Sequence, residues 1–321
     1  MLTEKIIDQL NTENKRIISR IISKVEEGNS GSVEILKMLH SKTGKAYRIG
    51  ITGPPGAGKS TLTNQLTKLY RKEGKTVGII AVDPTSPFTG GALLGDRVRM
   101  NEIGNDRGVF IRSMASRGSL GGLSKKSIDA ADVLDAAGYD FIIFETVGVG
   151  QSELDIAKAA DTTVVVLVPE SGDSIQAMKA GLMEIADFFV LNKSDRPGAD
   201  SALMSLQTIL MLRDHDEKSW LPQILKTVAQ ENKGIEEVAA EIERHKKYLN
   251  ESNLLLEKRK RNVNVRVQEI VDKTIITEIW NNERLGYLNE KSGQIISGEI
   301  SPYQMAEEIL NNYKKNITLN E

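Results

Sequence analysis

A glycine-rich loop at residues 53–61 constrains the fold of this chain more than any other stretch, because it lies between a short apolar run and a helical pattern. Its sequence, Gly-Pro-Pro-Gly-Ala-Gly-Lys-Ser-Thr, fits the phosphate-loop pattern G-x-x-x-x-G-K-[ST]. In such a loop the backbone N–H groups converge on phosphate oxygens, and the following helix points its positive dipole end at them. The alternative is a glycine-rich turn with an ordinary surface lysine, which the offset of Lys-Ser from the glycines disfavours.

The loop therefore predicts a site for a nucleoside triphosphate. We expect Lys59 to neutralise the β- and γ-phosphates and Ser60 to ligate Mg²⁺ through its hydroxyl. The residues expected to line the phosphates are Gly53, Pro54, Pro55, Gly56, Ala57, Gly58, Lys59, Ser60 and Thr61.

Apolar runs and helical patterns alternate after the loop. A helix with Leu62, Leu66 and Leu69 on one face is expected to end near Gly74. Buried strands are expected at 77–82, 109–114, 141–144, 163–168, 188–191 and 224–228, and helices at 127–137, 175–185, 204–212 and 235–249. This order predicts an α/β fold of the P-loop NTPase type with a mainly parallel central sheet.

Helical patterns flank this unit on both sides. Apolar residues recur at helical spacing within 2–25 and again within 33–39, and we expect both stretches to pack against the main domain. Near the other end, Ser301 and Gln304 predict a capping box at the start of the last helix. The predicted domains are an N-terminal helical extension at 1–45, a P-loop domain at 46–250 and a C-terminal helical region at 251–321.

Three acidic residues lie where a magnesium site is expected. Glu145 follows a buried strand at the place of a Walker-B acid, although it is one methylene longer than the more usual aspartate. Asp83 ends the strand at 77–82, and Asp96 lies in the long loop that follows. A helix-capping acid, an Asp-Pro turn and a solvated loop acid are the respective alternatives. The expected metal ligands are Ser60, Asp83, Asp96 and Glu145, and the expected catalytic residues are Lys59, Asp83, Asp96 and Glu145.

Two further features concern the γ-phosphate and the base. The amide of Gly148 is placed to meet the γ-phosphate, because it lies three residues after Glu145. Asn192, Lys193 and Asp195 fit the guanine-specificity pattern N-K-x-D after a buried strand. We expect the Asp195 carboxylate to accept from the guanine ring N–H and amine, which favours GTP over ATP. Backbone contacts to the base edge are expected, on a weaker signal, from Thr227, Val228 and Ala229.

Composition narrows the class of protein. The chain has 321 residues and no cysteine, which excludes disulfides, thiolate metal sites and cysteine nucleophiles. Its three histidines show no paired spacing, so a nitrogen-liganded metal site is disfavoured. A formal net charge of -2 gives no reason to expect nucleic-acid binding, and no apolar run is long enough to predict a membrane span. Acidic residues in the first turns are unlike a signal peptide, and we expect a cytoplasmic protein.

Five motifs together resemble the MeaB/ArgK family of P-loop GTPases, the methylmalonyl-CoA mutase-associated G-protein chaperones. These motifs are 53–61, 82–87 (Val-Asp-Pro-Thr-Ser-Pro), 90–97 (Gly-Gly-Ala-Leu-Leu-Gly-Asp-Arg), 145–152 and 192–195, within a resemblance that runs from about 16 to 303. The resemblance implies a homodimer with a helical C-terminal dimerisation arm. It also implies that GTP binding and hydrolysis gate delivery of adenosylcobalamin to a cobalamin-dependent acyl-CoA mutase, by default methylmalonyl-CoA mutase, and protect or reactivate that mutase.

The resemblance further implies an additional switch within residues 169–179, where the residues alone indicate only a loop and a helix start. The switch residues implied are Gly172, Asp173, Ser174 and Lys179. Nothing in the spacing makes Gln151 face the attacking water, so we expect slow intrinsic hydrolysis that the mutase accelerates. Two alternatives stay open: a P-loop ATPase or kinase linked to amino-acid transport, and a metal-insertion GTPase, which the lack of cysteine disfavours.

Overall fold

The computed structural model describes residues 7–83, 101–115, 125–146, 152–171, 180–211 and 219–318. The chain divides into two compact units, residues 1–256 and residues 257–321. Within the described ranges, none of the helices combines the length and the hydrophobicity that crossing a lipid bilayer requires.

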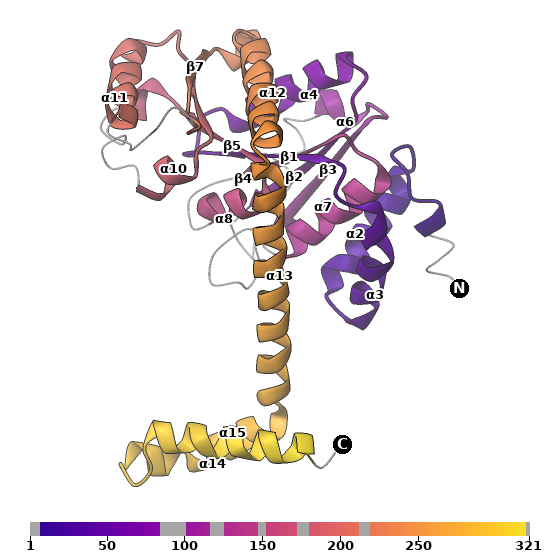
Figure 1. Cartoon of the computed structure of the whole chain (residues 1–321), viewed down its shortest axis with the longest axis vertical. Coiled ribbons are helices and arrows are strands. Elements are labelled where there is room, and N and C mark those ends of the chain that lie inside the picture. Colours follow the sequence, from indigo (N-terminus) through magenta and orange to yellow (C-terminus); the bar gives the residue numbers. More distant parts are fainter. Residues whose placement is uncertain are drawn as a thin grey trace. The chain divides into compact units, whose positions relative to one another are not determined.

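The first unit is built on a seven-stranded sheet with the strand order β3-β2-β4-β1-β5-β6-β7 (Figure 1). The strands are β1 (Tyr47–Thr52), β2 (Val77–Asp83), β3 (Val109–Ala115), β4 (Phe141–Thr146), β5 (Thr162–Leu167), β6 (Phe188–Asn192) and β7 (Ile224–Thr227). Every neighbouring pair is parallel, which confirms the predicted α/β fold with a parallel sheet. A parallel sheet is covered on both faces, and this explains why the strands read as continuous apolar runs.

Helices cover the two faces of the sheet. The helical elements of the first unit are α2 (Lys15–Glu27), α3 (Ser30–Leu39), η1 (His40–Lys42), α4 (Lys59–Lys72), α6 (Asn101–Gly104), α7 (Lys125–Ala137), α8 (Ser152–Ala159), η2 (Pro169–Ser171), α10 (Ala180–Ile185), α11 (Ala199–Met211), η3 (Ala229–Glu231) and α12 (Ile235–Glu251). Successive residues of a strand face opposite sides of the sheet. Ile49 and Ile51 of β1 pack with α4 and α12 on one side, whereas Gly50 packs against Ile156 of α8 on the other. On this second face α10 and α11 pack against β5 and β6.

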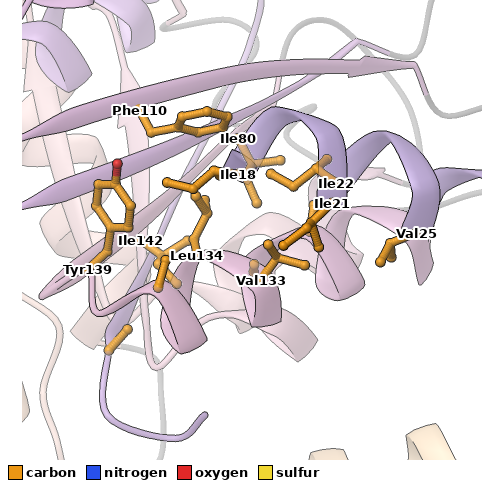
Figure 2. Packing of buried hydrophobic residues seen from close by; sticks show 14 of the residues in the cluster. Ile18, Ile21, Ile22, Val25, Ile80, Phe110, Val133, Leu134, Tyr139 and Ile142 are labelled. Atoms are coloured by element: carbon orange, nitrogen blue, oxygen red, sulfur yellow. The ribbon is translucent and has the colours of Figure 1, made fainter. Parts of the chain in front are cut away.

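Both N-terminal helices, α2 and α3, pack on α7, and Figure 2 shows the contact made by α2. Ile18, Ile21 and Ile22 of α2 are buried in one apolar cluster with Val133 and Leu134 of α7. The asparagine and glycine that flank α2 explain its limits, since the Asn14 side chain caps its first turn and Gly28 ends it with φ of 71°. The extension is thus part of the core of the first unit.

Asp135 on α7 fixes the junction between this extension and β1. Its carboxylate is 1% exposed and accepts hydrogen bonds from the backbone N–H groups of Gly44, Lys45 and Ala46 at 2.8, 3.0 and 3.0 Å. The guanidinium of Arg48 lies 3.4 Å from the same carboxylate. A buried acceptor with several donors therefore sets where β1 enters the sheet.

One helix begins earlier than the pattern predicts. Helix α11 starts at Ala199, not at residue 204. The apolar pattern did not reveal its first turn, because that turn buries only the small side chains of Ala199 and Ala202. A helix predicted at 175–185 is described only as α10, since residues 172–179 lie outside the described ranges.

The second unit consists of helices. Helix α13 (Leu254–Ile279) begins in the first unit and continues into the second, and α14 (Asn282–Ile296) and α15 (Pro302–Thr318) follow. The predicted capping box of the last helix is confirmed, because Gln304 N–H donates to Ser301 Oγ at 3.2 Å and Ser301 N–H donates to Gln304 Oε1 at 2.9 Å. Among the described residues of the second unit, only Met305 and Ile309 have buried apolar side chains.

Replacing Asp135 by alanine is expected to lower the free energy of unfolding of the first unit by about 2–4 kcal/mol, because three N–H groups would lose a buried acceptor. Urea unfolding measures the change through the fluorescence of Trp220. A Trp280→Phe background confines the signal to the first unit, since Trp280 belongs to the second.

Glu34→Ala is the matched control for this measurement. Glu34 forms an exposed ion pair with Lys37 on α3, so its loss is expected to change stability by less than about 0.5 kcal/mol. Equal effects of the two variants would show that Asp135 does not fix the junction.

Candidate functional site

The glycine-rich loop follows β1, which lies between β4 and β5 in the sheet. Gly53 has φ of 135°, and a Cβ atom there would lie 2.1 Å from the carbonyl oxygen of Val166 in β5. Gly58 has φ of 91°, and a Cβ atom there would lie 2.2 Å from the Asn192 Nδ2 atom. Both positions require glycine, for conformation and for space, and this packs the loop tightly against the ends of β5 and β6.

Lys59 and Ser60 open helix α4. The Lys59 side chain is 6% exposed, and its Nζ donates to the carbonyl oxygens of Gly53 and Pro54 at 2.7 and 3.0 Å. No side chain among the described residues caps this helix at Gly58, so the N–H groups of its first turn face the loop. A buried ammonium beside a helix N-terminus is the electrostatic setting that binds phosphate.

Ser60 and Glu145 come together beside the loop. The Ser60 hydroxyl donates to the Glu145 carboxylate, which is 1% exposed at the end of β4. Next to them, Thr146 Oγ1 donates to Thr52 Oγ1 at 3.1 Å. Hydroxyl and carboxylate oxygens are the ligands that Mg²⁺ prefers, so this pair fits a magnesium ion.

The other expected phosphate and metal residues are only partly described. The backbone of β2 ends at Asp83, but the side chain of Asp83 lies outside the described residues, and so do Asp96 and Gly148. Among the side chains that are described, no three histidines or carboxylates form a metal cluster. The expected switch residues, Gly172, Asp173, Ser174 and Lys179, lie outside the described ranges as well.

Asn192 ties three parts of the site together. Its side chain is 3% exposed, and Nδ2 donates to the carbonyl oxygen of Ala57 at 2.8 Å. Its Oδ1 accepts from Thr227 Oγ1 at 3.0 Å and from the N–H of Ala229 at 3.1 Å. One buried amide therefore joins the phosphate loop, the end of β6 and the segment after β7.

The turn at residues 192–196 is held from two further directions. Lys193 has φ of 57°, and its Nζ donates to the carbonyl oxygen of Gly56 at 2.9 Å. The Ser194 N–H donates to Thr227 O at 3.0 Å, and the Arg196 N–H closes the turn on Lys193 O at 3.1 Å. Asp195 lies exposed between these anchors. Its side chain is thus exposed on a turn whose backbone is held by hydrogen bonds.

Several contacts of this edge carry no signal in the sequence. Arg196 forms an ion pair with Glu170 of η2, and Thr146 pairs with Thr52 across β4 and β1. A pattern along the chain does not reveal which strand ends become neighbours, so these pairs emerge only from the sheet order.

A second polar network lies at the amino ends of the strands, and no sequence pattern predicted it. His245 of α12 is 1% exposed, and its Nδ1 lies 2.8 Å from Thr162 Oγ1 at the start of β5. Thr162 Oγ1 lies 2.6 Å from the Tyr47 hydroxyl at the start of β1, and burial raises the pKa of Tyr47 above its ordinary value. This network anchors α12 to the amino ends of the strands, away from the glycine-rich loop.

Three features meet at the carboxyl ends of the parallel strands: a phosphate loop, a serine and glutamate pair suited to magnesium, and a braced N-K-x-D turn. Together they define a P-loop GTPase. The family model described as "Methylmalonyl Co-A mutase-associated GTPase MeaB" matches residues 16–284. The chain belongs to this family, which confirms the resemblance seen in the motifs, and it is a GTPase.

Relatives from distant organisms support this family assignment. The chain is 36% identical over 257 residues to GTPase ArgK of Escherichia coli, covering 78% of this chain and 77% of that protein. It is 32% identical over 276 residues to the mouse protein named "Methylmalonic aciduria type A homolog, mitochondrial", covering 84% of this chain and 66% of that protein. A solved structure described as a LAO/AO transport system kinase aligns with a TM-score of 0.74 at 26% identity and covers 97% of both chains.

Gly58→Ala is expected to destabilise the first unit more than Gly56→Ala, by about 1–3 kcal/mol. A Cβ at Gly58 pushes Asn192 away from Ala57 O, whereas a Cβ at Gly56 meets nothing within 4 Å and leaves only the cost of a positive φ. Urea unfolding without nucleotide measures both variants. Equal losses would mean that the space filled by Asn192 does not matter.

Proposed function

We propose that this GTPase is a chaperone that binds and hydrolyses GTP to gate adenosylcobalamin delivery to a cobalamin-dependent acyl-CoA mutase and to protect or reactivate that mutase. Methylmalonyl-CoA mutase is the default partner, because the matching family is described as associated with it and a mouse relative is named for methylmalonic aciduria. The observation that carries guanine recognition is the turn at 192–196, which Asn192 and Lys193 brace against the phosphate loop.

In this proposal each part of the edge has one task. The N–H groups of 53–61 and the Lys59 ammonium bind the β- and γ-phosphates, and Gly148 meets the γ-phosphate. Ser60 and Glu145 hold Mg²⁺, together with Asp83 and Asp96. When bound, Mg²⁺ neutralises charge that develops on the phosphates. The residues proposed to read the base are Asn192, Lys193, Asp195, Thr227, Val228 and Ala229.

Guanine is favoured over adenine by the acceptor chemistry of Asp195. Its carboxylate can take two hydrogen bonds, from the guanine ring N–H and from the exocyclic amine, and adenine does not offer this pair of donors. Because the backbone on both sides of Asp195 is anchored, the turn has little freedom to adapt the carboxylate to a base of another shape. Binding of the wrong base would leave these hydrogen bonds unmade.

Asp195→Asn is expected to weaken GTP binding about 100- to 1000-fold, because two charge-assisted hydrogen bonds are lost, and to leave weak ATP binding unchanged. Titration calorimetry with GTP, ATP and XTP measures the effect, and the affinity for XTP is expected to rise in the variant. Asp200→Asn, which removes an exposed carboxylate on α11, is the control. Equal affinity of the unaltered protein for GTP and ATP would refute guanine recognition and favour the ATPase or kinase alternative.

The chaperone role is tested by capture of a mutase. Methylmalonyl-CoA mutase is expected to co-purify with the chain in the presence of a non-hydrolysable GTP analogue and to raise its rate of GTP hydrolysis. An isobutyryl-type mutase serves as the comparison. If neither mutase binds, the chaperone role fails while the GTPase activity stands; fast hydrolysis without a partner would contradict the expected gating.

The chain is further proposed to act as a cytoplasmic homodimer, and the second unit supports the association. Helix α13 has no buried residue, and a stripe of exposed apolar side chains runs along it at helical spacing. The members of this stripe are Val263, Val267, Ile270 and Val271. A 65-residue unit with two buried apolar side chains among its described residues has too little core to be stable alone, which favours a second copy as its partner.

The double variant Val267→Glu/Val271→Glu is expected to convert the dimer to a monomer, because charges on the stripe would be buried without partners. Light scattering during gel filtration measures the mass. Val265→Glu is the matched control, since residue 265 faces away from the stripe and is also exposed. A monomeric unaltered protein, or a dimer that survives the double change, would count against this interface.

A further inference from the structure

An ion pair joins the ends of two neighbouring strands beside the turn at 192–196. Arg196 Nη1 donates to Glu170 Oε1, and the two side chains are 47% and 52% exposed. Glu170 belongs to η2, which follows β5, and Arg196 follows β6. Strands β5 and β6 are hydrogen-bonded neighbours, with Leu167 opposite Leu191, so the pair spans the two strand exits.

The exit of β5 therefore meets both halves of the nucleotide site. At Val166 its backbone lies against Gly53, where a Cβ atom would come within 2.1 Å of the Val166 oxygen. Four residues later, Glu170 holds the guanidinium of Arg196, the residue directly after Asp195. Asn192 and Lys193 anchor the front of the turn to the phosphate loop, and the ion pair anchors its back to β5.

We infer that Glu170 and Arg196 are positioning residues for guanine recognition, which hold the Asp195 carboxylate in place by fixing the far end of its turn. The inference rests on the proposed guanine site and adds two residues outside the N-K-x-D pattern: Arg196, and Glu170 from the start of the segment 169–179. Neither side chain needs to touch the nucleotide. The hydrogen bond to Arg196 lowers the pKa of the Glu170 carboxyl, so the pair is charged throughout the neutral range.

The size of the effect follows from the exposure of the pair. Opposite charges in contact with water interact weakly and are screened by salt, so the loss of either charge should speed GDP release about two- to fivefold. A loosened Asp195 also reads the exocyclic amine of guanine less well. Inosine diphosphate lacks that amine, so the preference for GDP over inosine diphosphate should fall as well.

The experiment compares GDP and inosine diphosphate dissociation from Glu170→Gln, Arg196→Gln, the double variant and the charge-exchanged pair Glu170→Arg/Arg196→Glu. Each single variant is expected to release GDP faster and to discriminate less between the two nucleotides, the double variant no more than either single one. The exchanged pair should recover most of the loss. The control is Asp200→Asn, which breaks another exposed ion pair, with Lys226 at 2.5 Å, and should change neither quantity.

Unchanged GDP release in both single variants would overturn the inference. Equal acceleration for both nucleotides would do so as well, because it would indicate a general loss of structure. Amide exchange in the nucleotide-free chain gives a readout that does not depend on guanine binding. The Arg196 amide, which donates to Lys193 O, should exchange faster in Glu170→Gln than in Asp200→Asn. If that difference is seen but the protein does not prefer GDP over ADP, the proposed guanine site fails while the anchoring role stands; no difference in exchange would refute the anchoring itself.

Discussion

The buried amide of Asn192 is the interaction on which the arrangement of the site depends. It donates to the phosphate loop at Ala57 and accepts from Thr227 and Ala229, so one side chain relates the two ends of the nucleotide site. An amide that is 3% exposed and loses one of these partners would leave a polar atom without compensation, at a cost of about 1–3 kcal/mol. The Asn192 Nδ2 atom also leaves no room for a side chain at Gly58. The spacing between loop and turn is therefore set by a polar contact and a steric one together.

The sheet places this contact. Strand β1 lies at its centre, β4 brings Glu145 to one side, and β5 and β6 bring Val166 and Asn192 to the other. At the amino ends of the strands, Asp135 fixes where β1 begins, and the network of His245 fixes where α12 packs. Polar groups at the amino ends of the strands thus hold the scaffold, and those at the carboxyl ends form the proposed nucleotide site, where open parallel sheets bind ligands.

Much of this was predictable from the sequence, for a physical reason. Buried parallel strands are continuous apolar runs, and the phosphate loop and the N-K-x-D turn require particular residues at fixed spacing. The start of α11 was predicted five residues late because Ala199 and Ala202 bury faces too small to mark a helical stripe. The contacts between distant elements could not be predicted: Asp135 on α7 and Gly44 before β1 are 91 positions apart, and only the packing of α7 on the sheet brings them together. Asp96, Gly148 and the expected switch residues stay predictions from motifs.

The small core of the second unit has a thermodynamic consequence. A unit that buries Met305 and Ile309 but leaves the apolar stripe of α13 in water gains most of its stability from whatever covers that stripe. If a second copy covers it, mass action links its folding to the total protein concentration. Dilution would then unfold the second unit at a lower temperature, while the first unit, with its own core on both faces of the sheet, would melt at a temperature independent of concentration.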